Sequence, residues 1–136
     1  MRISAKAEYA CLALMALAER HHEDRPLPIR EIAEAQEIPK TFLTQILLKL
    51  KGAGLVLSTR GSSGGYRLAR PPEEIALIDV LKVINGYGIT LPEHNAPSAP
   101  VLAQVWDKIR ASEMEILSGT SIAALLERRD APHWVI

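Results

Sequence analysis

Thiols and aromatic rings are scarce in this chain of 136 residues. The single cysteine, Cys11, cannot form a disulfide within the chain and cannot alone hold a zinc ion or an iron–sulfur cluster. A secreted disulfide scaffold is therefore excluded, and we expect a protein of the reducing cytoplasm. Aromatic residues make up 4% of the chain, which argues against binding of single-stranded nucleic acid on stacked rings.

Long apolar runs are also missing. No stretch approaches the ~18 apolar residues of a membrane-spanning helix, and the segment from Met1 to Lys6 has no secretory signal. We therefore expect no membrane contact. Hydrophobic residues make up 48% and charged residues 24%, the ordinary balance of a folded globular protein. The length fits one compact domain with an oligomerisation element.

Catalytic signatures are absent from the sequence too. We find no phosphate-binding loop, no nucleophile elbow, no paired carboxylates at catalytic spacing and no clustered metal ligands. The sequence therefore predicts neither an enzyme nor a metal or cofactor site. His21 and His22 read as parts of a polar loop, and Cys11 as a packed, unreactive thiol within a helix.

The formal net charge of zero conceals an uneven distribution. Residues 1–71 carry a net charge of +4, and residues 72–136 carry −4. The segment 38–71 contains six basic residues and no acidic one. A local positive surface of this kind is typical of a protein that binds a polyanion such as DNA. A solvated, lysine-rich helix face would have the same composition, so charge alone leaves both interpretations open.

The periodicity of apolar residues predicts a mainly helical chain. Helices are expected over 5–20, 28–36, 39–53, 73–85, 99–118 and 120–129, and strands over 55–59 and 66–69. Three helices followed by a two-stranded β hairpin, the wing, form a winged helix-turn-helix. We therefore divide the chain into a DNA-binding domain (1–86), a loop (87–98) and a C-terminal part with a long dimerisation helix, a short last helix and a tail (99–136).

The third helix would be the recognition helix, whose first residues face base edges in the major groove. Its expected buried stripe is Phe42, Leu43, Ile46, Leu47 and Leu50. The residues expected to contact DNA on its other side are Pro39, Lys40, Thr41, Thr44, Gln45, Lys49 and Lys51. Gln45 can read adenine, and the two late lysines are placed to neutralise phosphate. The threonines could instead be ordinary solvent-facing residues.

The wing carries the most specific pattern. Arg60 is expected at the tip of a glycine-rich hairpin, where it can enter the narrow, strongly negative minor groove. Ser58, Gly61 and Arg67 complete the expected contacts of the wing. Glycines permit positive backbone angles and close approach to phosphate. A plain surface hairpin would explain the glycines, but not the arginine in a segment without acidic residues.

The wing sequence resembles that of a known bacterial family. The string Ser-Thr-Arg-Gly-Ser-Ser-Gly-Gly-Tyr-Arg-Leu-Ala-Arg-Pro over 58–71 is similar to the wing of the Rrf-two-type regulators. That family includes the iron–sulfur cluster regulator, the nitric-oxide-sensing repressor and the cysteine-metabolism repressor. The start of the chain, from Met1 to Ala10, is also similar to that family. The same holds for Ile32-Ala33 and for Phe42-Leu43. The resemblance implies a homodimeric winged-helix transcription factor on a pseudo-palindromic operator, contacting it through the recognition helix and Arg60.

One family feature is missing. Cluster-binding members carry three cysteines between the fourth helix and the long helix, whereas residues 86–102 contain none. Iron–sulfur clusters need thiolates, and Glu8, Glu93 and His94 are too few to replace them. We therefore expect a member of the family without an iron–sulfur cluster.

The long helix carries an apolar stripe that is too wide for one small domain to cover. Leu102, Val105, Ile109, Ser112 and Ile116 recur every three or four residues, and Trp106 and Leu117 widen the stripe. Burial against a second copy would cover it. The alternative is that the helix packs only on its own domain. We expect dimerisation through Leu102, Val105, Trp106, Ile109 and Ile116.

These observations favour a DNA-binding transcriptional regulator, with repression as the expected direction. Double-stranded DNA and a second copy of the chain are the expected partners. Two alternatives remain. The chain could be an interaction module that docks a partner enzyme, for which the tail Trp134-Val135-Ile136 would be suitable. It could also respond to a small-molecule effector in a pocket near residues 87–106, lined by Tyr87, His94 and Trp106.

Overall fold

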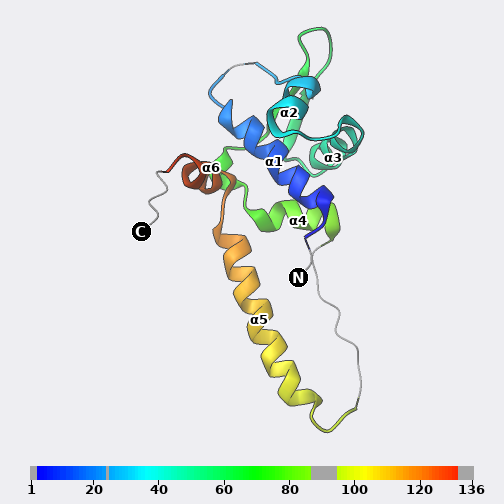
Figure 1. The fold of residues 1–136 in the computed structure, drawn as a ribbon, viewed down its shortest axis with the longest axis vertical. Coiled ribbons are helices and arrows are strands. Elements are labelled where there is room, and N and C mark those ends of the chain that lie inside the picture. Colours follow the sequence, from blue (N-terminus) through cyan, green and yellow to red (C-terminus); the bar gives the residue numbers. More distant parts are fainter. Residues whose placement is uncertain (1–2, 24, 87–94, 132–136) are drawn as a thin grey trace.

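The computed structural model describes residues 3–23, 25–86 and 95–131. Within these ranges the chain forms six α-helices, one 3-10 turn and one two-stranded sheet. The elements are α1 (Ala5–Glu19), α2 (Ile29–Gln36), α3 (Lys40–Gly52), β1 (Val56–Thr59), β2 (Gly65–Leu68), η1 (Pro72–Glu74), α4 (Leu77–Asn85), α5 (Ala99–Gly119) and α6 (Ile122–Asp130). Figure 1 shows α1 to α4, α6 and the hairpin gathered at one end, with α5 extending away from them. The structure is a winged helix-turn-helix with a long C-terminal helix, as the sequence predicts.

Helix α1 forms the centre of the winged-helix domain. It packs against α2, α3, α4 and α6, and its buried side is rich in alanine. Small side chains at Ala10 and Ala13 let the neighbouring helices approach closely, while Leu14 fills the space between them. Ser4 begins the helix by accepting a hydrogen bond from the Ala7 N–H at 3.1 Å. The central position of α1 fixes the orientation of α2 and α3.

The turn between α2 and α3 is short. Glu37 ends α2 in the left-handed conformation, with φ 52° and ψ 46°. Its neighbour Ile38 is buried, and the Ile38 N–H donates to the carbonyl of Ala33 at 3.0 Å. Pro39 then begins α3. This tight reversal gives α2 and α3 the relation of a helix-turn-helix pair.

The helix predicted over 73–85 is wrong in its first part. Pro72–Glu74 forms a 3-10 turn, Ile75 and Ala76 are extended, and α4 begins only at Leu77. The extended pair is held by a distant segment of the chain. The Ile122 N–H donates to the carbonyl of Ile75, and the Leu77 N–H donates to the carbonyl of Thr120, both at 2.9 Å. Pairing with the start of α6 therefore overrides the local helical pattern.

The stripe predicted for α3 is also wrong at one position. Leu43, Ile46, Leu47 and Leu50 are buried as expected, but Phe42 is 41% exposed. The Phe42 ring lies beside that of Tyr9 on α1, with ring centroids 5.9 Å apart. Phe42 thus stands at the edge of the helix–helix contact rather than within it.

The wing is an antiparallel hairpin. Val56 pairs with Leu68, Leu57 with Arg67, Ser58 with Tyr66 and Thr59 with Gly65. The chain just before α2 adds to its edge, since Leu27 and Tyr66 exchange two backbone hydrogen bonds of 2.8 and 2.9 Å. A Cβ atom at Gly65 would overlap the backbone carbonyl of Leu27. Glycine at this position therefore lets the α1–α2 loop lie directly against β2.

Candidate nucleic-acid interface

Helix α3 turns one polar face to solvent. Its four buried leucine and isoleucine side chains anchor the opposite face to the domain core. All seven residues predicted to contact DNA from this helix are exposed, namely Pro39, Lys40, Thr41, Thr44, Gln45, Lys49 and Lys51. Leu48, which the sequence reading did not single out, is exposed on the same helix. The structure therefore presents the predicted residues together on the accessible side of α3.

The beginning of α3 determines what its side chains can offer to DNA. Proline at position 39 has no N–H, and the first N–H groups of a helix lack partners within it, so they are free to meet phosphate. The Thr44 hydroxyl donates to the Lys40 carbonyl at 3.0 Å. Its oxygen therefore offers an acceptor and its methyl an apolar contact. Gln45 keeps both donor and acceptor for a base edge.

The wing places Arg60 directly after β1. Arg60 is exposed and follows the last paired residue, Thr59. Gly61 has φ 109°, a conformation that side chains disfavour, and a Cβ atom at Gly64 would overlap the carbonyl of Thr59. The glycines therefore shape a tight hairpin tip that carries the arginine outward. Gly64 is required by the wing's own backbone, independently of any approach to phosphate.

Two predicted wing residues lie on different faces of the hairpin. Ser58 pairs with Tyr66, and Arg67 pairs with Leu57 at the neighbouring position of the ladder. Side chains at neighbouring positions of a strand point to opposite faces. The structure therefore does not bring Ser58 and Arg67 together, and one face of the wing offers only one of them to DNA.

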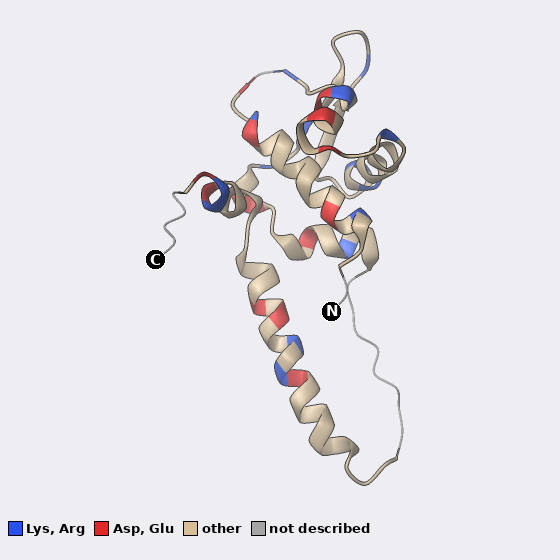
Figure 2. Ribbon diagram, in the orientation of Figure 1, with Lys and Arg blue, Asp and Glu red and all other residues tan. Residues whose placement is uncertain are grey.

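Most of the basic residues of segment 38–71 lie on two elements, α3 and the wing. Figure 2 shows Lys and Arg on α3 and on the wing loop, with no Asp or Glu on either. The acid-free segment 38–71 therefore forms the recognition helix and the wing, which lie at the same end of the molecule. Clustering of cations on these two elements is the electrostatic pattern of a duplex-binding surface.

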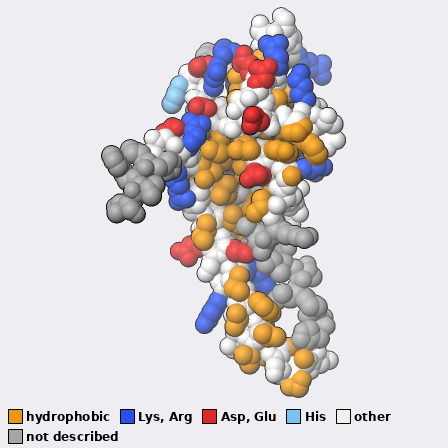
Figure 3. All heavy atoms as spheres, viewed as in Figure 1, with side chains coloured by type: hydrophobic (Ala, Val, Ile, Leu, Met, Phe, Trp, Pro, Cys, Tyr) orange, Lys and Arg blue, Asp and Glu red, His pale blue; other side chains and the backbone are white. Residues whose placement is uncertain are grey.

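Helix α5 carries an exposed apolar stripe. Leu102, Val105, Ile109 and Ile116 are between 47% and 66% exposed, and Trp106 is 43% exposed. Val101, which was not among the residues predicted for the stripe, is 65% exposed and joins this set, because it lies one helical turn before Val105. Figure 3 shows the orange side chains of α5 running down the narrow part of the molecule.

Leu117 does not belong to the exposed stripe, contrary to the prediction. It is 6% exposed and packs with Ala7, Ile78 and Leu81. Half-buried Met114 packs against the same cluster. These contacts attach the C-terminal end of α5 to α1 and α4, and they leave the N-terminal turns of the helix to project from the domain.

Several predicted features lie outside the described residues. Tyr87 and His94, two of the three side chains expected around an effector pocket, fall in the gap at 87–94, and the tail 134–136 falls beyond residue 131. Trp106 is described, and it contributes to the exposed stripe of α5. A cavity that the sequence reading missed lies elsewhere, between the α1–α2 loop and the wing.

The residues present do not fit an iron–sulfur cluster. Burial and the nearby carboxylate of Glu8 raise the pKa of the Cys11 thiol to about 11, so this sole cysteine stays a neutral thiol at neutral pH. Across the described ranges, no three His, Cys, Asp or Glu side chains gather as metal ligands. In the same part of the chain no helix is long and apolar enough to cross a membrane.

Comparison with known proteins supports this geometry. Residues 3–128 match the model of the Rrf2 family, described as an iron-dependent transcriptional regulator. An HTH-type transcriptional regulator, CymR of Bacillus subtilis, is 32% identical over 130 residues, which cover 96% of this chain and 93% of that protein. IscR of Aliivibrio salmonicida, another HTH-type transcriptional regulator, is 40% identical over 85 residues, or 62% of this chain and 50% of that protein.

Solved structures give the same result. The structure of CymR, the global cysteine regulator of B. subtilis, matches with a TM-score of 0.85 and 30% identity over 96% of this chain and 99% of that one. IscR of T. potens matches with a TM-score of 0.79 and 31% identity over 98% of this chain and 94% of that one. The chain therefore belongs to the Rrf2 family of DNA-binding transcriptional regulators.

Proposed function

We propose that the protein is a cytoplasmic, homodimeric repressor that binds a pseudo-palindromic operator without an iron–sulfur cluster. The observation that carries this proposal is the exposed polar face of α3 next to Arg60 in a segment with no acidic residue. Repression requires only that the dimer occupy its operator. Activation would require a further contact with the transcription machinery.

Each recognition helix enters a major groove. Thr41, Thr44 and Gln45 lie on the exposed face of the first turns of α3, the part of a recognition helix that reaches base edges. Lys49 and Lys51 lie in the last turn, where they neutralise phosphates of the backbone. Sequence preference therefore belongs to the first two turns of the helix, and salt-dependent affinity to the last.

The wing reaches the adjacent minor groove. Arg60 is carried by a hairpin tip that glycine keeps narrow, and arginine is the side chain that a narrow minor groove attracts most strongly. Arg67 lies on the outer face of the hairpin with Leu57, and it contacts phosphate rather than a base.

Dimerisation occurs through α5. A helix that leaves its domain with six large apolar side chains exposed gains stability by packing them against a second copy. Two-fold symmetry of the dimer then matches two-fold symmetry of the operator. Regulation does not use an iron–sulfur cluster, because a single cysteine with a raised pKa cannot supply the thiolates.

The test is fluorescence anisotropy with DNA from the gene's own upstream region and a scrambled duplex, over a series of salt concentrations. We expect selective binding by a colourless protein, weakening steeply as salt rises. Arg60→Ala should weaken specific binding by ~1–3 kcal/mol. Arg128→Ala, which removes another exposed arginine, on α6, should bind as the wild type does. Equal affinity for the two duplexes, or wild-type affinity of the Arg60 variant, would contradict the proposal.

A further inference from the structure

A cavity of about 270 Å³ separates the α1–α2 loop from the wing. Leu17 at the end of α1, Leu27 before α2, and Tyr66 and Leu68 on β2 give it apolar walls. The volume is slightly below the ~300 Å³ at which pockets for drug-sized ligands begin, so it fits a molecule the size of an amino acid. None of these residues belongs to the exposed face of α3 or to the stripe on α5.

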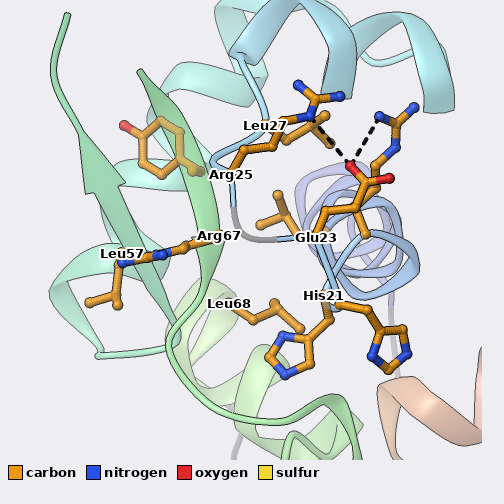
Figure 4. Close-up of a pocket in the computed structure, with 11 residues that line it drawn as sticks. His21, Glu23, Arg25, Leu27, Leu57, Arg67 and Leu68 are labelled. Atoms are coloured by element: carbon orange, nitrogen blue, oxygen red, sulfur yellow. Dashed lines mark ion pairs between the residues drawn. The ribbon is translucent and has the colours of Figure 1, made fainter. Parts of the chain in front are cut away.

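The rim of the cavity is rich in cationic groups. Arg20, Arg25 and Arg67 line it together with His21 and His22, against one carboxylate, Glu23. Figure 4 shows Glu23 between two guanidinium groups at one end of the cavity, His21 near the other, and Arg67 reaching across the strands toward Leu57. Glu31, just outside the lining, is a second acidic partner of Arg25.

The ion pairs at this rim are loose. Arg20 and Arg25 lie 3.6 and 3.4 Å from the Glu23 carboxylate, and Arg25 lies 3.7 Å from that of Glu31. A tight pair in the same protein, between Arg129 and Glu19, measures 2.8 Å. Charge-assisted hydrogen bonds are strongest at about 2.7–2.9 Å, so the rim arginines keep capacity for a better-placed anion.

We propose that this cavity binds a small organic carboxylate with an apolar body and that the bound molecule is an effector of DNA binding. The apolar part lies against Leu27, Tyr66 and Leu68, while the carboxylate takes up the guanidinium donors of Arg20 and Arg25. Leu57, which also lines the cavity, is exposed at its mouth. Recognition thus needs both a charge and an apolar group on the ligand.

The position of the cavity explains how such a ligand acts on DNA. Leu27 and Tyr66 exchange two backbone hydrogen bonds, so the α1–α2 loop and the wing share one sheet edge. A ligand held between that loop and β2 fixes the wing, and with it Arg60, relative to α2 and α3. Binding of the ligand and of DNA are then coupled, and each changes the affinity of the other by the same factor. This second step rests on the proposed function, whereas binding to the cavity does not.

Binding is tested first without DNA. Isotope-labelled full-length protein is titrated with benzoate and with isovalerate while backbone amide NMR shifts are followed. We expect saturable shifts at Leu27, Leu57, Tyr66 and Leu68 with at least one of the two carboxylates. Benzyl alcohol, which lacks the charge, and acetate, which lacks the larger apolar body, should bind at least about fivefold more weakly. Absence of saturable shifts at these residues with both carboxylates would overturn the proposal.

A matched pair of variants assigns the charge contact. Arg20→Gln removes one rim guanidinium, and Arg128→Gln removes an exposed arginine that does not line the cavity. We expect the Arg20 variant to bind the carboxylate about fivefold or more weakly and the Arg128 variant to bind it as the wild type does. The dispersion of the amide spectrum verifies that each variant is folded. Equal affinity of the wild type and the Arg20 variant would overturn the assignment.

Coupling is then measured by anisotropy with operator DNA. A saturating concentration of the carboxylate should change the affinity of the wild type for DNA about fivefold or more, and that of Arg20→Gln by much less. If the carboxylate binds but DNA affinity stays the same, the effector role is wrong and the binding site stands. If the protein binds no operator at all while carboxylate binding persists, the proposed function is what fails.

Discussion

Glu37 reverses the direction of the chain between the two helices of the helix-turn-helix pair. Among the described residues it is the only one other than glycine with a positive φ, and it is exposed at the end of α2. A left-handed conformation costs a side chain roughly 1–2 kcal/mol relative to glycine. The helix-turn-helix pair therefore forms against a local backbone cost, which the burial of Ile38 and the packing of α3 offset.

Replacement of Glu37 by glycine should therefore stabilise the fold. We expect Glu37→Gly to raise the free energy of unfolding by up to about 1 kcal/mol, because glycine adopts this conformation without strain. Glu34→Gly, which removes a similarly exposed glutamate from the interior of α2, should lower it by about 1 kcal/mol. Urea denaturation followed by circular dichroism measures both. A destabilised Glu37 variant would show that its side chain makes a contact that matters.

Cys11 makes the free energy of unfolding depend on pH in the alkaline range. Its pKa is raised to about 11 by burial and by Glu8, whereas the thiol of the unfolded chain ionises near its ordinary value of 9.0. Between these values the unfolded chain releases a proton that the folded protein keeps, so the free energy of unfolding falls as pH rises from 9 to 11.

Removal of the thiol should make that fall shallower. We expect Cys11→Ala to lower stability at neutral pH, because a packed side chain is lost, but to lose less of its remaining stability between pH 9 and 11. Urea denaturation across this pH range compares the two slopes. Parallel curves for the variant and the wild type would mean that the thiol keeps its ordinary pKa in the folded protein.

At the scale of elements, one end of α5 is attached to the domain, and the rest of the helix carries the exposed stripe that forms the proposed dimer interface. Leu117 fixes one end of the helix to the cluster formed with Ala7, Ile78 and Leu81, while the exposed stripe occupies the turns from Val101 to Ile116. A charge on the stripe should disturb the proposed dimer and leave the fold of the protomer intact, because these side chains are exposed in the protomer.

Ile109→Glu should therefore dissociate the proposed dimer while leaving the protomer folded. Placing a carboxylate in an apolar interface should weaken dimerisation by about 3 kcal/mol, which is on the order of 100-fold in Kd. Lys108→Glu adds the same side chain at the neighbouring exposed position and should have a small effect. Sedimentation equilibrium measures both variants. Unchanged association of the Ile109 variant would place the dimer interface elsewhere.

Elements with strong local patterns could be predicted from the sequence. The periodic stripes of α1, α3 and α5 and the glycines of the wing place these elements within a few residues of their observed bounds. The break at Ile75 and Ala76 could not be predicted, because it depends on hydrogen bonds to Thr120 and Ile122, more than forty residues away in sequence. The cavity behind the wing was missed for the same reason, since Leu27 meets Tyr66 only in the folded chain.

The candidate interface shows the same contrast. Exposure of the predicted residues on α3 follows from helical periodicity, which is local information. The place of Phe42, beside Tyr9 of α1, depends on how α1 and α3 pack, and the separation of Ser58 from Arg67 depends on the pairing of the hairpin strands. The sequence was thus sufficient to select candidate residues for DNA contact. The structure was needed to show which face of the helix or hairpin each of them occupies.

At the scale of the whole molecule, charge and apolar surface are separated. Helix α3 and the wing, which carry cations and no acidic residue of their own, lie at one end, and the exposed apolar stripe of α5 extends from the other side of the domain. Two copies joined along α5 would present two recognition helices and two wings to one duplex. Such a dimer would fix the spacing of two half-sites in the DNA as well as the affinity for it.

The most direct test is in vitro selection of duplexes from a random library by the full-length protein, followed by sequencing. The account predicts enrichment of an inverted repeat whose half-sites lie about one helical turn, ~10 base pairs, or a small multiple of that distance apart. Ile109→Glu should select the same half-site without the repeat. Enrichment of no sequence, or of a single non-repeated site by the wild type, would contradict the claim that this chain is a dimeric, sequence-specific regulator.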